Sequence, residues 1–214
     1  MRKSLGKLIA RFQREVIGLR GLFMSQAPIG SANGIWFRPL PIAAQSYATV
    51  RLQDAWARYC RALILMSAQG RVRTTSGQLL PASNLVQSAG GDALTALKLT
   101  YPRSRQSRPL WEPKWFDANE AYDAAARLQI ANLSTVSAIT ATGNALDDLR
   151  MCRNFLAHRG QTSSAEVDQV RRRMGVSLNL SVEDLMNIVV LPGTTSLFEV
   201  WCDELLQKAT NAAK

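Results

Sequence analysis

Apolar residues recur along most of the chain at intervals of three and four, the spacing that gives a helix one apolar face. Between these stretches, glycine, proline and small polar residues mark turns and loops. The pattern predicts an all-α fold, a helical bundle formed by a single domain over residues 1–214. The predicted helices span residues 1–24, 46–70, 93–99, 117–142, 144–160, 163–175, 182–190 and 196–212.

Three of these helices begin with the motif of a capping box, in which a polar residue is followed three positions later by glutamate. The expected cap pairs are Asp117 with Glu120, Ser163 with Glu166, and Ser196 with Glu199. Asp92 and Ser181 are the expected N-caps of two shorter helices, because their side chains can accept from free amides of the first turn.

Three segments lack the helical spacing. Residues 25–45 are rich in proline and glycine and are predicted to form a long loop. Within residues 71–92, a short β-hairpin is predicted around Ser76 and Gly77. A further loop, 101–115, interleaves arginines with aromatic residues, a combination that binds single-stranded nucleic acid through phosphate contacts and stacking. The alternative for this loop is that its tryptophans pack against the core.

The segment from Asn144 to Gly160 has the most distinctive pattern. Asn144 is expected to cap its N-terminus, and Gly160 is expected to end it in a left-handed conformation. The expected core-facing residues are Leu146, Leu149, Cys152, Phe155 and Leu156. A polar stripe at helical spacing is formed by Arg150, Arg153, Asn154, Ala157 and His158. The only histidine of the chain therefore shares a helix face with two arginines and an amide.

The run from Arg153 to His158, R-N-F-L-A-H, resembles the signature of the HEPN superfamily. In that signature an arginine, often followed by a polar residue, precedes a histidine late on a helix. The resemblance covers this helix closely and the all-helical layout of the chain loosely. It implies a helical bundle that is usually dimeric. In many members it implies a metal-independent endoribonuclease that acts as a toxin or an antiviral effector.

The residue types in this stripe also suit RNA cleavage, in which the ribose 2′-hydroxyl attacks the adjacent phosphate. The reaction needs a base, an acid and positive charge on the phosphorane. His158 is the candidate general acid/base, because histidine gains and loses a proton near neutral pH. Arg153 is the candidate phosphate ligand, because its guanidinium is planar and permanently charged. Asn154 is expected to orient this pair or to bind phosphate.

One histidine cannot easily serve as base and acid at once, so a homodimer through the 144–160 helix is expected, as the resemblance also implies. Further RNA contacts are expected from Arg150, Arg159, Arg103, Arg105, Arg108, Arg171 and Arg172. An antitoxin or another regulatory protein is a further candidate partner. One toxin branch of the superfamily carries a modified tyrosine two residues after the histidine. Gly160 occupies that position here, so neutralisation by that route is not predicted.

The composition indicates which partners and which cellular location to expect. The formal net charge is +10, from 26 basic and 16 acidic residues, which favours a polyanionic partner, nucleic acid before anionic membrane. No segment is long and apolar enough to span a bilayer, so no membrane partner is expected. Three irregularly spaced cysteines and one histidine predict no disulfide framework, no metal site and no cofactor. These features indicate a cytoplasmic protein.

An alternative function follows from the position of His158 in the last turn of its helix, where a histidine also complements the helix dipole. In that case the chain is a non-catalytic HEPN-like module that binds RNA, a nucleotide or a partner protein. A serine triad is disfavoured because the lone histidine has arginines and no carboxylate beside it on its helix. A phosphate-binding glycine loop is absent from the sequence.

Overall fold

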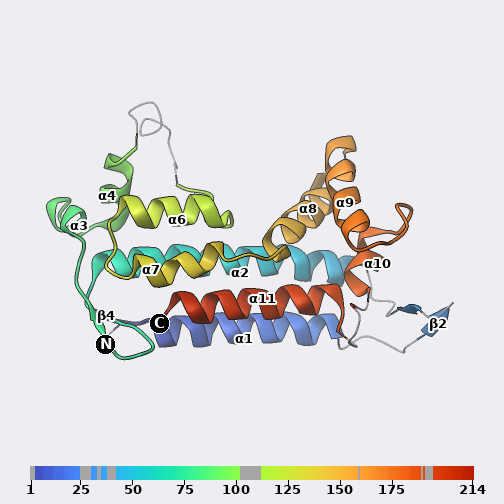
Figure 1. The fold of residues 1–214 in the computed structure, drawn as a ribbon, viewed down its shortest axis with the longest axis horizontal. Helices are drawn as coiled ribbons and strands as arrows, with labels where there is room; N and C mark the ends of the chain where they lie inside the picture. The colour runs from blue at the N-terminus through green and yellow to red at the C-terminus, as the bar shows by residue number, and fades with distance from the viewer. Residues whose placement is uncertain are drawn as a thin grey trace. The chain divides into compact units, whose positions relative to one another are not determined.

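The computed structural model describes residues 3–24, 30–32, 35–37, 42–101, 112–158, 160–188, 190 and 195–214. These residues are mainly helical with only short strands, which confirms the predicted all-α helical bundle (Figure 1). The chain divides into two compact units. Unit 1 comprises Met1–Arg14, Ala55–Thr142 and Leu206–Lys214, and unit 2 comprises Glu15–Asp54 and Gly143–Leu205.

Three long helices each contribute one part to each unit. They are α1 (Leu5–Met24), α2 (Ile42–Gln69) and α11 (Leu197–Ala212). All three were predicted from apolar spacing, but α1 begins at Leu5 instead of residue 1, and α2 begins at Ile42 instead of Ser46. Long, strongly periodic helices are predicted well because the buried face repeats over many turns.

In unit 1, the N-terminal part of α1 packs against α2 through aromatic side chains. The ring of Phe12 lies 4.9 Å from that of Tyr59 and 6.0 Å from that of Trp56, measured between centroids, and all three residues are buried. The hydroxyl of Tyr59 donates to the carbonyl of Ala209 on α11 at 2.6 Å. Burial raises the pKa of the Tyr59 phenol far above its usual value, so the hydroxyl remains a donor.

Unit 1 contains a three-stranded sheet. Strand β4 (Val72–Arg73) pairs antiparallel with β5 (Leu79–Leu80), which confirms the predicted hairpin. Strand β1 (Lys3–Ser4) pairs in parallel with β4, with Lys3 opposite Val72 and Ser4 opposite Arg73. This parallel pairing was not predicted, because two residues are too few for a periodic signal.

The remaining helices of unit 1 are short. They are α3 (Asn84–Ser88), α4 (Ala93–Leu99), α6 (Ala118–Arg127), α7 (Leu133–Val136) and the 3-10 helix η1 (Ser137–Thr140). The predicted caps Asp92 and Asp117 each accept from two backbone amides of the helix that they precede. A capping box would have Glu120 accept from the amide of Asp117. Its side chain accepts instead from the amide of Lys114 at 3.0 Å, so only the Asp117 half of the predicted box is formed.

The prediction of a single helix over 117–142 is wrong. The helix stops at Arg127, Gln129 takes a left-handed φ of +52°, and the chain restarts as α7 and η1. Hydroxyl groups of Ser137 and Thr140 each donate to a carbonyl three residues earlier. These local side-chain bonds compete with α-helical hydrogen bonds within η1, whereas the break after Arg127 coincides with the left-handed backbone of Gln129, which apolar spacing does not reveal.

Unit 2 contains α8 (Ala145–His158), α9 (Gln161–Arg173), α10 (Val182–Asn187) and a hairpin of β2 (Gly30–Ala32) with β3 (Ile35–Phe37). Ser181 caps α10 as predicted, by accepting from the amide of Asp184 at 3.0 Å, but the helix ends at Asn187 and not at residue 190. The hairpin lies inside the segment predicted to be a loop. Its two strands are joined by Asn33-Gly34, a pair typical of hairpin turns that would have predicted it.

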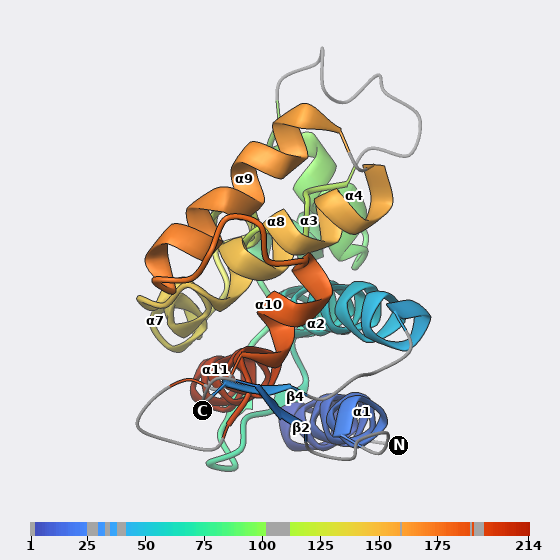
Figure 2. The ribbon, with the colours of Figure 1, turned by 90° about the vertical axis from the view of Figure 1, so that its right-hand side faces the viewer.

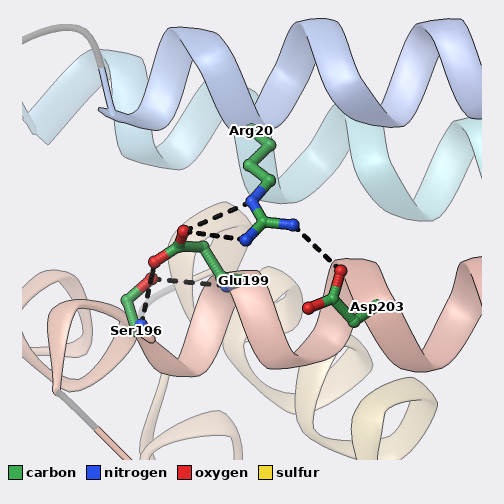
Figure 3. Close-up of polar contacts among 4 residues, drawn as sticks. All are labelled: Arg20, Ser196, Glu199 and Asp203. Carbon is green, nitrogen blue, oxygen red and sulfur yellow. Dashed lines mark hydrogen bonds and ion pairs between the residues drawn. The ribbon is translucent and has the colours of Figure 1, made fainter. Parts of the chain in front are cut away.

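The capping box at the start of α11 is confirmed and is extended by an ion pair (Figure 3). Glu199 accepts from the amide of Ser196 at 2.9 Å, and the hydroxyl of Ser196 accepts from the amide of Glu199 at 3.3 Å. Arg20 of α1 donates to Glu199 at 3.2 Å and to Asp203 at 2.9 Å. Burial alone would raise the pKa of Glu199, but the bonds from Ser196 and Arg20 outweigh it and lower the pKa.

Candidate functional site

Helix α8 confirms the element predicted over 144–160 and begins directly after Asn144, but its C-terminal end differs from the prediction. At the N-terminus, the amide of Ala145 donates to the carboxylate of Glu204 on α11 at 3.3 Å, so a residue far away in sequence satisfies it. At the C-terminus, Gly160 has an extended backbone with φ −91° and ψ 168°. The prediction of a left-handed Gly160 is therefore wrong. It is the N-cap of α9, so α9 follows α8 almost directly.

The start of α9 also corrects a prediction. Ser163 was expected to cap the helix together with Glu166, but α9 begins two residues earlier. The hydroxyl of Ser163 accepts from the amide of Gly160 at 3.0 Å and donates to its carbonyl at 2.8 Å. The predicted end is confirmed at Gly175, whose left-handed φ of +67° stops the helix.

Helices α8 and α9 form a closely packed pair within unit 2 (Figure 2). Two ion pairs join them: Asp148 with Arg173, and Arg150 with Glu166 at 3.3 Å. Asp148 is 2% exposed, so this first-turn carboxylate belongs to the packed interface between the two helices. Leu149 and Cys152 complete the buried face of α8. Packing against α9 therefore holds α8 in place.

Burial decreases along α8 toward its C-terminus. Of the apolar residues predicted to face the core, Leu149 and Cys152 are buried, whereas Leu146, Phe155 and Leu156 are only half-buried. The last turn thus carries partly uncovered apolar side chains next to the polar stripe.

The three central candidates lie on this less buried end of α8. Arg153 and Asn154 are half-buried and His158 is exposed. None of the three side chains forms a hydrogen bond or ion pair within the part of the chain that the structure describes. Helical geometry separates Arg153 from His158 by about 140° around the axis and about 7.5 Å along it, with Asn154 between them. Within one chain, the guanidinium and the imidazole therefore project from the helix axis in different directions.

The N-terminus of α9 lies two residues beyond His158. Its first turn contains no acidic residue, and the one side-chain bond there among the described residues is that of Ser163 with the backbone of Gly160. A helix N-terminus carries partial positive charge, which offsets the partial negative charge at the C-terminus of α8. The junction therefore presents an imidazole and a guanidinium that pair with no carboxylate among the described residues.

The other expected RNA contacts occupy different environments. Arg172 is exposed. Arg171 is 6% exposed and donates to Asp168 at 2.6 Å, so it supports α9 and is not available at the surface. Arg150 is half-buried and ion-paired with Glu166. Four further candidates, Arg103, Arg105, Arg108 and Arg159, lie outside the described residues.

The described ends of the 101–115 loop favour packing for two of its aromatic residues. Tyr101 is buried, and the guanidinium of Arg127 lies 4.3 Å from the centre of its ring. Trp115 is also buried and donates from Nε1 to Glu112 at 2.7 Å. Arg61 donates to the same carboxylate at 2.8 Å, and this bond lowers the pKa of Glu112.

The three cysteines are free and buried, as expected of structural thiols. Burial raises the pKa of both Cys152 and Cys202 to about 12. Among the described residues, no group of three or more His, Cys, Asp or Glu side chains is arranged to hold a metal ion. No helix in the same part of the chain combines the length and the apolar character needed to cross a membrane.

Comparisons with protein-family models, with curated proteins and with solved structures each return no match to this chain.

Proposed function

We propose that this protein is a metal-independent endoribonuclease of the HEPN type that acts as a toxin or antiviral-defence effector. The observation that carries the proposal is the set Arg153, Asn154 and His158 on one end of α8, none of which has a partner among the described residues. Polar side chains of a folded protein are usually satisfied by neighbours or by water, so an unpartnered cluster next to a helix N-terminus suits an anionic ligand.

In the proposed reaction, the imidazole of His158 takes the proton from the ribose 2′-hydroxyl, or returns a proton to the leaving 5′-oxygen. The 2′-oxygen attacks phosphorus, the bond to the 5′-oxygen breaks, and a cyclic 2′,3′-phosphate remains. Arg153 binds the phosphate oxygens and stabilises their charge in the transition state. Asn154 donates to the phosphate or holds it between the other two groups.

The site is completed in a homodimer in which α8 of each subunit faces the other. Two features support this arrangement. Phe155 and Leu156 are half-buried, which leaves apolar surface for a partner. Arg153 and His158 point away from each other on one helix, so two chains would bring the arginine of one near the histidine of the other. A second His158 would also supply the second proton transfer.

The supporting residues follow from the packing. Arg150 and Arg173 form ion pairs with Glu166 and Asp148 that hold α8 against α9, and Arg171 pairs with Asp168 within α9. Arg172, Arg159 and the loop arginines Arg103, Arg105 and Arg108 are the proposed contacts for the rest of the RNA. A protein antitoxin that covers the α8 end would block the same residues.

The test is incubation of purified protein with single-stranded RNA in EDTA. Cleavage that leaves cyclic 2′,3′-phosphate ends, and that is lost in His158→Ala, supports the proposal. Cleavage that appears only when magnesium is added excludes this mechanism. Binding of intact RNA without any cleavage identifies the chain instead as a non-catalytic binding module.

A further inference from the structure

The positive charge of the chain is divided unequally between the two units. Unit 1 contains 17 Lys and Arg residues and five Asp and Glu residues, which gives a formal charge of +12. Unit 2 contains nine basic and eleven acidic residues, which gives −2. The candidate site on α8 therefore belongs to a slightly acidic unit, and the net charge of +10 originates entirely in the other one.

Every acidic side chain of unit 1 either caps a helix or forms an ion pair. Asp92 and Asp117 cap helices. Glu112, Glu120 and Asp123 pair with Arg61, Lys114 and Arg127 respectively. Unit 1 therefore has more basic residues than carboxylates, and each of its carboxylates already bonds to a helix terminus or a cation.

Five of these cations, which we call the N-terminal basic patch, are Lys7, Arg11, Arg14, Arg71 and Arg73. All five are exposed, and none forms an ion pair with a described residue. The first three follow helical spacing and form a row about 10 Å long on one face of α1. The parallel pairing of β1 with β4 brings the start of α1 to the hairpin that carries Arg71 and Arg73.

We propose that the N-terminal basic patch is a binding surface for the phosphate backbone of a nucleic acid, separate from the residues of α8. A row of exposed cations neutralises successive phosphates and releases their counterions, which gives affinity without sequence preference. A membrane surface fits less well, because the large apolar residues of this part of α1 are turned inward. Leu5, Ile9 and Phe12 are 0%, 5% and 3% exposed, so the helix has no apolar face to insert.

The inference does not depend on RNA cleavage, and its test uses a probe that cannot be cleaved. A single-stranded 2′-O-methyl oligonucleotide lacks the attacking hydroxyl, so fluorescence anisotropy reads binding alone. Titrations over a range of salt give the slope of log affinity against log salt. Replacing Lys7, Arg11 and Arg14 with Gln is expected to reduce that slope by about 2, from the value of about 0.7 per phosphate contact for single strands.

The matched control is the triple variant Lys7→Arg, Arg11→Lys and Arg14→Lys, which keeps the three charges and should keep the slope. Lys7→Gln alone should lower the slope by about 0.7, and it provides a second reading if the triple variant is poorly folded. An unchanged slope in the Gln variants overturns the proposal. Tighter binding to vesicles containing phosphatidylserine than to the oligonucleotide also overturns it, in favour of a membrane. RNA cleavage assays on the same variants report separately on the α8 site.

Discussion

Arg150 of α8 donates from Nη1 to Oε1 of Glu166 on α9 at 3.3 Å. This contact separates two groups of side chains within the polar stripe of α8. Arg150 is neutralised and holds the two helices together, whereas Arg153, Asn154 and His158 one to two turns later have no partner among the residues that the structure describes. The N-terminal part of the stripe thus joins α8 to α9, whereas the side chains of its C-terminal part remain available to a ligand.

The available end gives the first prediction. His158→Ala and Arg153→Ala should each reduce RNA cleavage at least about 100-fold, because each removes a group that acts on the transition state. Their melting temperatures should equal that of the wild type, since neither side chain makes a described contact. The control is Asp147→Asn, an exposed change on the same helix, which should leave cleavage intact. Equal activity of the His158 variant and the wild type would refute catalysis by this residue.

The dimer gives the second prediction. In a composite site with Arg153 and His158 from opposite chains, a mixed dimer of Arg153→Ala and His158→Ala chains retains one site with an arginine and a histidine, although it lacks the second histidine. Random mixing of the two inactive variants should therefore restore part of the wild-type activity, at most about a quarter. Sedimentation velocity of the wild type checks the premise. A fully active monomer at the assay concentration would exclude a composite site.

The third prediction concerns the buried carboxylate of α8. Asp148→Ala should lower the free energy of unfolding by about 2 kcal/mol, because it leaves Arg173 without its partner. The cost lies below that of a fully buried pair, since the side chain of Arg173 is 36% exposed and can turn to water. Asp147→Ala, at the exposed neighbouring position, should change it by less than about 0.5 kcal/mol. Urea denaturation compares the two, and equal effects would contradict the buried ion pair.

The fourth prediction is a pH dependence that arises from Glu199. Its pKa is lowered in the folded protein, because the bonds from Ser196 and Arg20 outweigh the effect of burial. A depressed carboxylate pKa stabilises the fold above the ordinary pKa of glutamate, and this stabilisation is lost as the pH falls through the folded value. The stability difference between wild type and Glu199→Gln should therefore be largest near about pH 7 and shrink toward about pH 3.

The control for this pH series is Asp203→Asn. Asp203 also contacts Arg20, but its side chain is 55% exposed, so solvent screens the pair. The urea midpoint of this variant should follow that of the wild type across the same pH range. A Glu199→Gln variant whose deficit is constant with pH would show that the carboxylate charge is not what matters.

The fifth prediction tests the start of α8. Gly143 has φ +154°, and a Cβ at this position would overlap the carboxylate of Glu204, which accepts from the amide of Ala145. Gly143→Ala should therefore destabilise the protein by at least about 1 kcal/mol. Gly18→Ala on α1 meets no atom within 4 Å and should stabilise it by about 0.5–1 kcal/mol. Thermal unfolding of both variants measures the contrast.

The sequence by itself determined the elements whose signal is local or repeated. The periods of α1, α2 and α11 repeat over many turns, and the caps at Asp92, Asp117 and Ser196 lie within three residues of the amides that they satisfy. The helical spacing of Arg153, Asn154 and His158 follows from the same local geometry. The predicted 117–142 helix failed because the chain breaks at Gln129, whose left-handed backbone is not revealed by apolar spacing.

The tertiary structure decided which polar residues are available. Arg150 and Arg171 have the same sequence character as Arg153 and Arg172, but carboxylates on neighbouring turns or helices occupy the first two. The cap of α8 comes from Glu204, far along the chain, and the pairing of β1 with β4 assembles the N-terminal basic patch from separate segments. Ion pairs and strand contacts between distant residues depend on how the chain packs, and the composition gives only their total charge.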